Sequence, residues 1–182
     1  LLRETDDEVL VHHIHMVNQE GRHKIEAERA RRIVKWCEEN IREVKYSESG
    51  VDHRGFLFFG YDIVTVGFEA GIVCHSYFAS QNRMPDRWAI GACSEEPHWM
   101  ERWAHVKACL AANCFPQEPP KTLRFPIIPK LDEIRYLPAE LVEMAWTCRT
   151  PVVVDGEHTE CGKCQTCELM IKVRKENREK TA

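Results

Sequence analysis

Apolar and polar residues follow one another along the chain in blocks that predict strands and helices in turn. Residues 8–16, "EVLVHHIHM", form an apolar, β-branched run without Gly or Pro, which predicts a buried strand. Residues 23–40 carry apolar side chains at helical spacing with charged residues on the opposite face, which predicts an amphipathic helix. A second, shorter strand is expected over residues 41–49.

The middle of the chain, residues 54–79, is long, apolar and interrupted by glycines. We expect most of it, from about Tyr61, to be a buried helix packed closely against a sheet, although residues 63–66 are equally compatible with a strand. The pattern beyond this segment predicts, in order, a strand over 86–93, a helix over 98–114, a break at 115–121, a strand over 123–129, a short helix over 130–138 and a helix over 139–148 that ends at Cys148.

This alternation of strands and helices predicts an α/β fold with a doubly wound parallel sheet, covered by helices on both faces. Ligands of such sheets bind beyond the carboxyl ends of the strands, where we expect the loops Met16–His23 and Gly91–Trp99 to meet. We expect one domain in two parts. Residues 1–118 form the α/β core, and residues 119–182 add a strand, helices and a cysteine-rich element.

Composition and charge narrow the class of protein. Of the 182 residues, 43% are hydrophobic, which is enough to bury a real core. We expect a soluble, cytoplasmic chain, because no apolar stretch approaches the ~20 residues of a membrane helix and no signal peptide opens the sequence. The net charge of −4 argues against nucleic-acid binding, and the mixed charges of residues 172–180 are typical of a solvated helix face.

Four of the nine cysteines have the spacing of a metal site. The segment "CGKCQTC" places Cys161, Cys164 and Cys167 three residues apart, and Cys148 precedes them by twelve intervening residues. Four thiolates close a tetrahedral zinc site without a vacancy, so this pattern predicts structural zinc. An iron–sulfur cluster and a pair of disulfides are the alternatives, and His158 is a possible substitute ligand.

The elements "WTC" at 146–148 and "CGKCQTC" at 161–167 resemble the 7-cyano-7-deazaguanine synthase family. This family belongs to the PP-loop, adenine nucleotide alpha hydrolase-like superfamily. The segment "PKLDEI" is similar to the short Lys-x-Glu-Ile element of the family. The segment "RHKIEAERARRIVKW" is similar to its His-x3-Glu helix, although here only two residues separate His23 from Glu26. The resemblance therefore implies a catalytic role for Lys130 and cofactor-binding roles for His23 and Glu26.

Two motifs of the family are missing. The phosphate-binding loop Ser-Gly-Gly-x-Asp-Ser does not occur in these residues, and "SEEPHWMERW" stands where the family has its Asp-Tyr and Pro-Asp-Cys-Arg pattern. Phosphate binding needs consecutive backbone amides at a helix start, which a Gly-rich turn supplies. Because residues 1–3 resemble the end of a helix, we expect the loop upstream of Leu1 and weak ATP binding by this chain alone.

The resemblance implies an ATP-dependent, Mg²⁺-dependent ligase. Such an enzyme converts 7-carboxy-7-deazaguanine and ammonia to 7-cyano-7-deazaguanine through an acyl adenylate and an amide. Glu95, Glu96 and Arg54 are candidate substrate-binding residues, and the family suggests a homodimer. Trp99 and Trp103 are candidates for stacking on the substrate, although an apolar stripe at helical spacing is more often core.

Other interpretations remain open for several of these residues. Lys130 and Arg54 have the ordinary alternative of a solvent-facing charge. The imidazoles of "HHIH" suggest a metal, but packed or hydrogen-bonded strand histidines are the simpler reading. At the level of function, the chain is either this ligase, a divergent relative that adenylates another carboxylate or joins a deazapurine to a macromolecule, or a non-catalytic zinc-bearing binding subunit.

Overall fold

The computed structural model describes residues 2–57, 60, 62–91, 94–95, 98–123 and 127–181. Their contacts group the chain into two compact units, one of residues 1–57 with 130–182 and one of residues 58–129. This grouping differs from the division expected near residue 118, because the chain after Pro129 returns to the first unit. The two units are described separately below.

Unit 1 is built on a strand–helix–strand element. Strands β1 (Leu10–Val17) and β2 (Lys45–Asp52) pair in parallel over their whole length, and α1 (His23–Asn40) is the crossover between them. The strand expected at 8–16 and the helix expected at 23–40 are confirmed, but β1 is half-buried along its whole length and not buried as expected. The second strand begins later than expected, because the Ile41 N–H still bonds the Cys37 carbonyl at 2.8 Å and ends α1.

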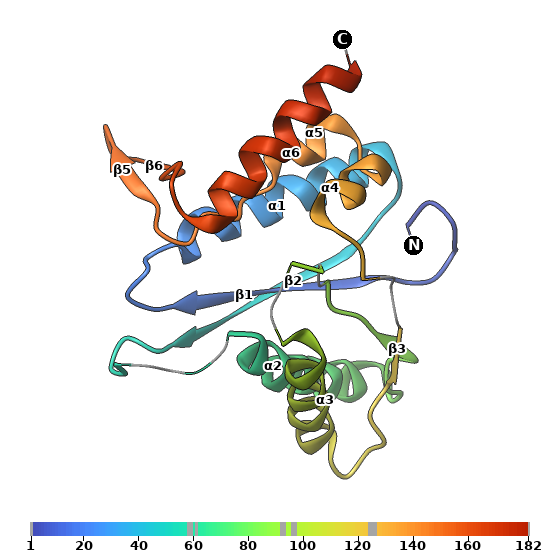
Figure 1. Ribbon diagram of the computed structural model, residues 1–182. Coiled ribbons are helices and arrows are strands. Elements are labelled where there is room, and N and C mark those ends of the chain that lie inside the picture. Colours follow the sequence, from blue (N-terminus) through green and yellow to red (C-terminus); the bar gives the residue numbers. More distant parts are fainter. Residues whose placement is uncertain are drawn as a thin grey trace. The chain divides into compact units, whose positions relative to one another are not determined.

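The remaining helices of unit 1 come from the end of the chain. They are α4 (Lys130–Glu133), a 3₁₀ turn (Ile134–Tyr136), α5 (Ala139–Met144) and α6 (Gln165–Thr181). Figure 1 shows α1, α4, α5 and α6 on the same side of β1 and β2. Val142, Met170 and Val173 are buried together, so α5 and α6 share one small core.

One expectation for this region is wrong. The helix expected to reach Cys148 stops at Met144, because Ala145 takes up an extended conformation. The segment 149–160 contains the antiparallel hairpin β5 (Val152–Val154) and β6 (Glu157–Thr159), which was not predicted from the sequence. Asp155 and Gly156 form its turn with φ of 51° and 84°. Asp-Gly is the usual sequence of such a two-residue turn, so a signal for the hairpin was present.

Unit 2 contains a second strand–helix–strand element. The two-residue strands β3 (Arg87–Trp88) and β4 (Lys121–Thr122) are parallel, with α3 (Trp99–Cys114) between them in the chain. The helix expected at 98–114 is confirmed, and the strand expected at 86–93 is much shorter. β4 begins before the strand expected at 123–129; residues 123 and 127–129 are not in a strand, and residues 124–126 lie outside the described part of the chain.

The long helix α2 (Asp62–Gln81) packs against α3 in unit 2. Its start confirms that a helix begins near Tyr61, and the alternative strand at 63–66 is wrong. The expected burial against a sheet is not seen in the described residues, because α2 packs against a helix and leaves Phe68 and Ile72 exposed. Gly67 lies against Val106 and Gly71 against Leu110, so the two helices run in the same direction. By length and composition α2 could cross a membrane, contrary to our expectation that no stretch is long enough, but Glu69 is buried on it.

The strands of the described residues form three separate two-stranded sheets. The fold is therefore mixed α/β, with two parallel strand–helix–strand elements and one antiparallel hairpin. A single doubly wound sheet is not formed by the described part of the chain.

Candidate metal centre

Four cysteine sulfurs converge in unit 1. The Sγ atoms of Cys148, Cys161, Cys164 and Cys167 all lie within 4.8 Å of one another, and those of Cys161 and Cys167 are 3.9 Å apart. Four sulfurs at about 2.3 Å from a shared zinc ion would be separated by about 3.8 Å in a tetrahedron. The sequence prediction that these four residues share one site is thus confirmed, and the donor set and its spacing fit a zinc-like ion.

Three segments bring the sulfurs together. Cys148 ends the extended run after α5, Cys161 and Cys164 lie between β6 and α6, and Cys167 is in the first turn of α6. Cys148 and Cys167 are fully buried, whereas Cys161 and Cys164 are half-buried. A bound ion would therefore hold the ends of α5, the hairpin and α6 at one point.

Hydrogen bonds orient the sulfurs. The backbone N–H of Cys161 donates to Cys148 Sγ at 3.3 Å, and that of Cys164 donates to Cys161 Sγ at 3.4 Å. The Thr150 hydroxyl donates to Cys161 Sγ at 3.4 Å. Thr166 Oγ1 lies 3.2 Å from Cys164 Sγ and donates to the Thr147 carbonyl at 2.7 Å. The two backbone N–H groups and the Thr150 hydroxyl stabilise negative charge on sulfur, as thiolate ligands require.

The four thiols are not equally acidic. The Thr150 hydroxyl lowers the pKa of Cys161. Burial raises the pKa of Cys164, but the Thr166 hydroxyl and nearby backbone amides outweigh it and lower the value to about 5. Burial raises the pKa of Cys148 and of Cys167. Two sulfurs therefore favour the thiolate, and the two buried ones need a cation beside them to become thiolates.

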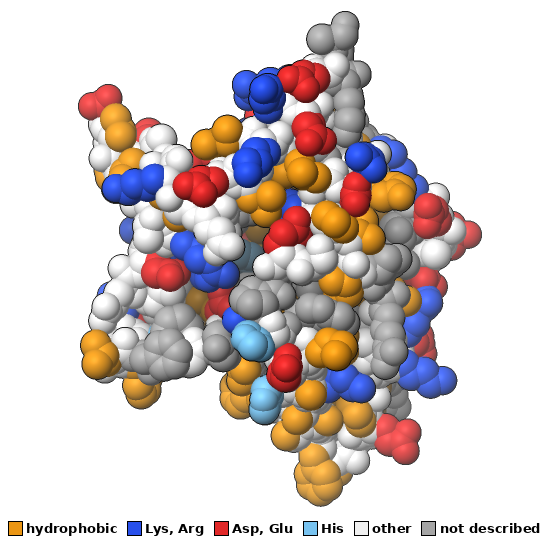
Figure 2. Space-filling model, viewed as in Figure 1, with side chains coloured by type: hydrophobic (Ala, Val, Ile, Leu, Met, Phe, Trp, Pro, Cys, Tyr) orange, Lys and Arg blue, Asp and Glu red, His pale blue; other side chains and the backbone are white. Residues whose placement is uncertain are grey.

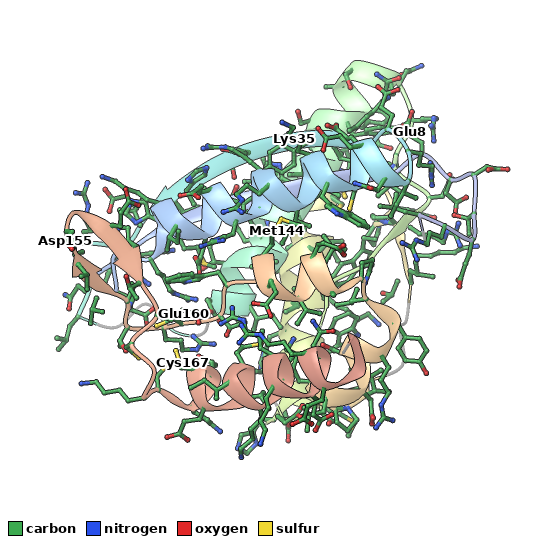
Figure 3. All side chains as sticks on the ribbon, turned by 90° about the horizontal axis from the view of Figure 1, so that it is seen from above. Glu8, Lys35, Met144, Asp155, Glu160 and Cys167 are labelled. Atoms are coloured by element: carbon green, nitrogen blue, oxygen red, sulfur yellow. The ribbon has the colours of Figure 1, made fainter. Side chains whose placement is uncertain are left out.

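Arg174 of α6 links the segment after α5 to the segment after β6. Arg174 donates both terminal nitrogens to the Glu160 carboxylate, and its Nη2 donates to the Ala145 carbonyl at 2.8 Å. The Glu160 carboxylate raises the pKa of Arg174. Figure 3 shows Glu160 and Cys167 close together at the start of α6, with Asp155 at the far tip of the hairpin. The charge pair thus holds α6, the segment after β6 and the segment after α5 together.

We expect Arg174→Met to destabilise unit 1 by about 1–3 kcal/mol, because it leaves the half-buried Glu160 carboxylate without its strongest partner. The matched control is Arg178→Met, one turn along α6. The Arg178 side chain is 72% exposed and pairs with Glu143, so its loss should cost under about 1 kcal/mol. Urea unfolding of both variants measures the difference, and equal losses would show that the Arg174 contact is not specific.

The other expected site residues pair with near neighbours. Lys130 Nζ lies 3.0 Å from the Glu133 carboxylate within α4. Arg54 donates to Asp52 at 2.6 Å, and this guanidinium lowers the pKa of the Asp52 carboxyl to about 2. The described residues do not bring Lys130 or Arg54 to the sulfur cluster.

His23 and Glu26 both lie in the first turn of α1. Glu26 accepts a hydrogen bond from the buried Arg22 at 2.7 Å, and His23 Nδ1 is buried with no partner among the described residues. Glu95, in unit 2, is exposed and lies 3.4 Å from the Ser94 hydroxyl. Glu96 lies outside the described residues. The structure thus places His23 and Glu26 in the same turn of α1, and neither is among the four clustered residues.

The candidate stacking residue Trp103 and the cysteines outside the cluster lie in helices and have packing roles. Trp103 stacks on Trp88 with ring centroids 5.2 Å apart, so it is engaged within unit 2, and the side chain of Trp99 lies outside the described residues. The described cysteines outside the cluster all lie on helices; these are Cys37, Cys74, Cys109 and Cys114. Cys93 lies outside the described residues.

Sequence reasoning missed the residues that support the sulfurs. Thr150, Thr166, Glu160 and Arg174 contact the ligands or join their segments. Thr166 had a local signal, since it lies inside the cysteine motif. Glu160 and Arg174 had no local sequence signal, because their contact depends on the direction of α6 relative to the segment after β6.

Comparisons with protein-family models, with curated proteins and with solved structures return no match for this chain. The proposed function therefore rests on the four-cysteine cluster, the mixed α/β fold and the sequence motifs.

Proposed function

We propose that the chain is part of an ATP-dependent ligase in which four thiolates hold a structural zinc ion. The convergence of Cys148 with the "CGKCQTC" motif supports this proposal most directly, because that combination carries the resemblance to 7-cyano-7-deazaguanine synthases. A closed four-thiolate site leaves no coordination position for a substrate, so zinc would order the C-terminal element rather than take part in the reaction.

The proposed substrates are 7-carboxy-7-deazaguanine, ATP with Mg²⁺, and ammonia. Adenylation turns a carboxylate, which repels nucleophiles, into an ester with a good leaving group, and ammonia then displaces AMP. Activation and dehydration of the amide give the nitrile. Parallel strand–helix–strand elements of the kind seen in both units are common in nucleotide-binding α/β proteins, which agrees with this class. We further propose a doubly wound sheet in the whole protein, a cytoplasmic location and a homodimer.

A second candidate is a zinc-bearing binding protein without catalysis. It is favoured by the pairing of Lys130 with Glu133 and of Arg54 with Asp52, since both cations already have an anionic partner. A divergent ligase that adenylates another carboxylate, or joins a deazapurine to a macromolecule, is the third possibility.

Metal analysis and a turnover assay test the proposal. We expect about one Zn per chain, as a closed four-thiolate site holds one ion, and visible absorbance from iron would contradict zinc. The full-length protein with 7-carboxy-7-deazaguanine, ATP and ammonium should release AMP and form the nitrile. AMP release with a different carboxylate would indicate a divergent ligase. Zinc without any carboxylate-dependent AMP release would favour the binding protein.

A further inference from the structure

The three imidazoles of "HHIH" on β1 lie in three different environments. His12 is on one face of the strand, where Nδ1 lies 2.8 Å from the Ser47 hydroxyl and Nε2 lies 3.0 Å from the Ser49 hydroxyl. Both of its nitrogens are engaged with β2. His13 and His15 share the other face with Glu48, and there the pattern of hydrogen bonds is different.

His15 is held through one nitrogen only. Its Nε2 lies 2.7 Å from Glu48 Oε2, and its side chain is 23% exposed. Within the described part of the chain, His15 makes no hydrogen bond through Nδ1. This imidazole is therefore anchored at one end and available at the other.

Glu48 determines which nitrogen of His15 carries the proton. Arg31 of α1 donates to both carboxylate oxygens, at 2.6 and 2.5 Å, and the Tyr46 hydroxyl donates at 2.7 Å. Arg31, with Tyr46 and His15, lowers the pKa of the Glu48 carboxyl, so Glu48 is ionised and only accepts hydrogen bonds. Neutral His15 must then carry its proton on Nε2 and present a lone pair at Nδ1.

His13 adds a second unusual imidazole beside the first. Its ring lies 5.1 Å from that of His15, nearly perpendicular, and its Nε2 is buried with no partner among the described residues. Burial and the nearby His15 lower the pKa of His13. An unpaired buried nitrogen is destabilising, and a hydrogen bond from a polar ligand atom would remove that penalty.

The position of these groups fits a ligand site. His15 lies near the carboxyl end of β1, and this is the edge of parallel strands at which α/β proteins bind their ligands. The charged and titratable groups around His15 are His13, Glu48, Tyr46, Arg31 and, at the start of α1, His23. A carboxylate that fixes one nitrogen of an imidazole leaves the other nitrogen oriented as a base.

We propose that His15 is the general base for a nitrogen nucleophile, either ammonia or a primary amine, and that Glu48 is its positioning residue. This inference rests on the proposed ligase function. In the step concerned, the C–N bond forms, the bond from the acyl carbon to the AMP oxygen breaks, and AMP leaves with that electron pair. The proton lost by nitrogen goes to Nδ1 of His15 and from there to solvent. Adenylation itself releases no such proton, so it does not need this base.

The two half-reactions separate this inference from the proposed function. Exchange of labelled pyrophosphate into ATP, dependent on the carboxylate, reports adenylation alone. For His15→Gln in the full-length protein we expect unchanged exchange and about 10²–10⁴-fold slower amide formation, the usual contribution of a general base. The loss should shrink at high pH, where more of the nucleophile is already unprotonated. Equal loss of both half-reactions, or loss of neither, would overturn the role of His15.

Two controls complete the experiment. His12→Gln removes an imidazole of the same strand from the opposite face, and it should leave both half-reactions unchanged. Nitrogen NMR of the wild-type imidazoles should show His15 in the Nε2–H tautomer, and an Nδ1–H tautomer would overturn the inference even with an active enzyme. If the wild-type protein shows no carboxylate-dependent exchange, the proposed ligase function is wrong, and the proposed role of His15 as a general base is then wrong as well.

Discussion

If the four-cysteine cluster holds a metal ion, Cys164→Ser is expected to weaken its binding and to destabilise unit 1 before it affects any chemistry. Zinc binding supplies about 10–16 kcal/mol in small zinc elements, so weakening one of four ligands should cost several kcal/mol. The affected residues are those joined at the cluster, which are the ends of α5 and of the hairpin and the start of α6. Zinc stoichiometry and thermal unfolding of the purified variant measure both effects.

Cys37→Ser is the matched control for this experiment. Cys37 is a half-buried cysteine on α1 of the same unit and is not among the four clustered sulfurs. It should keep its zinc and lose little stability. A Cys164→Ser protein that remains folded with a full complement of zinc would show that Cys164 is not a ligand.

The cluster was predictable because its signal is chemical and mostly local. Cys161, Cys164 and Cys167 lie within seven residues of one another. The fourth residue, Cys148, is the next cysteine before them in the sequence. The amphipathic helix α1 was predictable for a similar reason, since helical spacing of apolar residues persists over 18 residues. Signals of this kind do not depend on how distant segments pack.

The parts that were not predicted depend on packing or on short segments. Strands β3 and β4 have two residues each, too few for a periodic pattern. The β5–β6 hairpin has Val152, Val153 and Val154 exposed, so an apolar run here did not indicate burial. Figure 2 shows hydrophobic side chains at the surface of this hairpin, at the upper left. The Arg174–Glu160 pair needed the direction of α6, which sequence spacing does not give.

The histidine strand shows where sequence and structure complement each other. Because side chains alternate between the two faces of a strand, His13 and His15 lie on one face of β1. The sequence did not show that Glu48 of β2 would hold His15, because that contact follows from the parallel register, in which His13 is opposite Glu48. The β1–β2 register therefore determines which histidine of "HHIH" is hydrogen-bonded to Glu48.

Gly71→Ala is expected to destabilise unit 2 strongly. A Cβ atom at this position would lie 2.5 Å from the Asn113 Cβ and 2.8 Å from the Leu110 carbonyl oxygen. Neither contact can be relieved by turning a flexible side chain, so α2 and α3 must move apart. The core of Cys74, Leu110 and Cys114 lies between them and would lose its packing. Such overpacking costs about 1–3 kcal/mol or more, which exceeds the gain of up to about 1 kcal/mol in helix propensity.

The control for this prediction is Gly91→Ala, in the same unit. No atom lies within 4 Å of a Cβ built on Gly91, so alanine should fit there without displacing a neighbour. Urea unfolding should then show a lower midpoint for Gly71→Ala and little change for Gly91→Ala. A Gly71→Ala protein as stable as the wild type would mean that α2 and α3 are not in close contact at this point. In that case the parallel packing of the two helices in unit 2 would have to be revised.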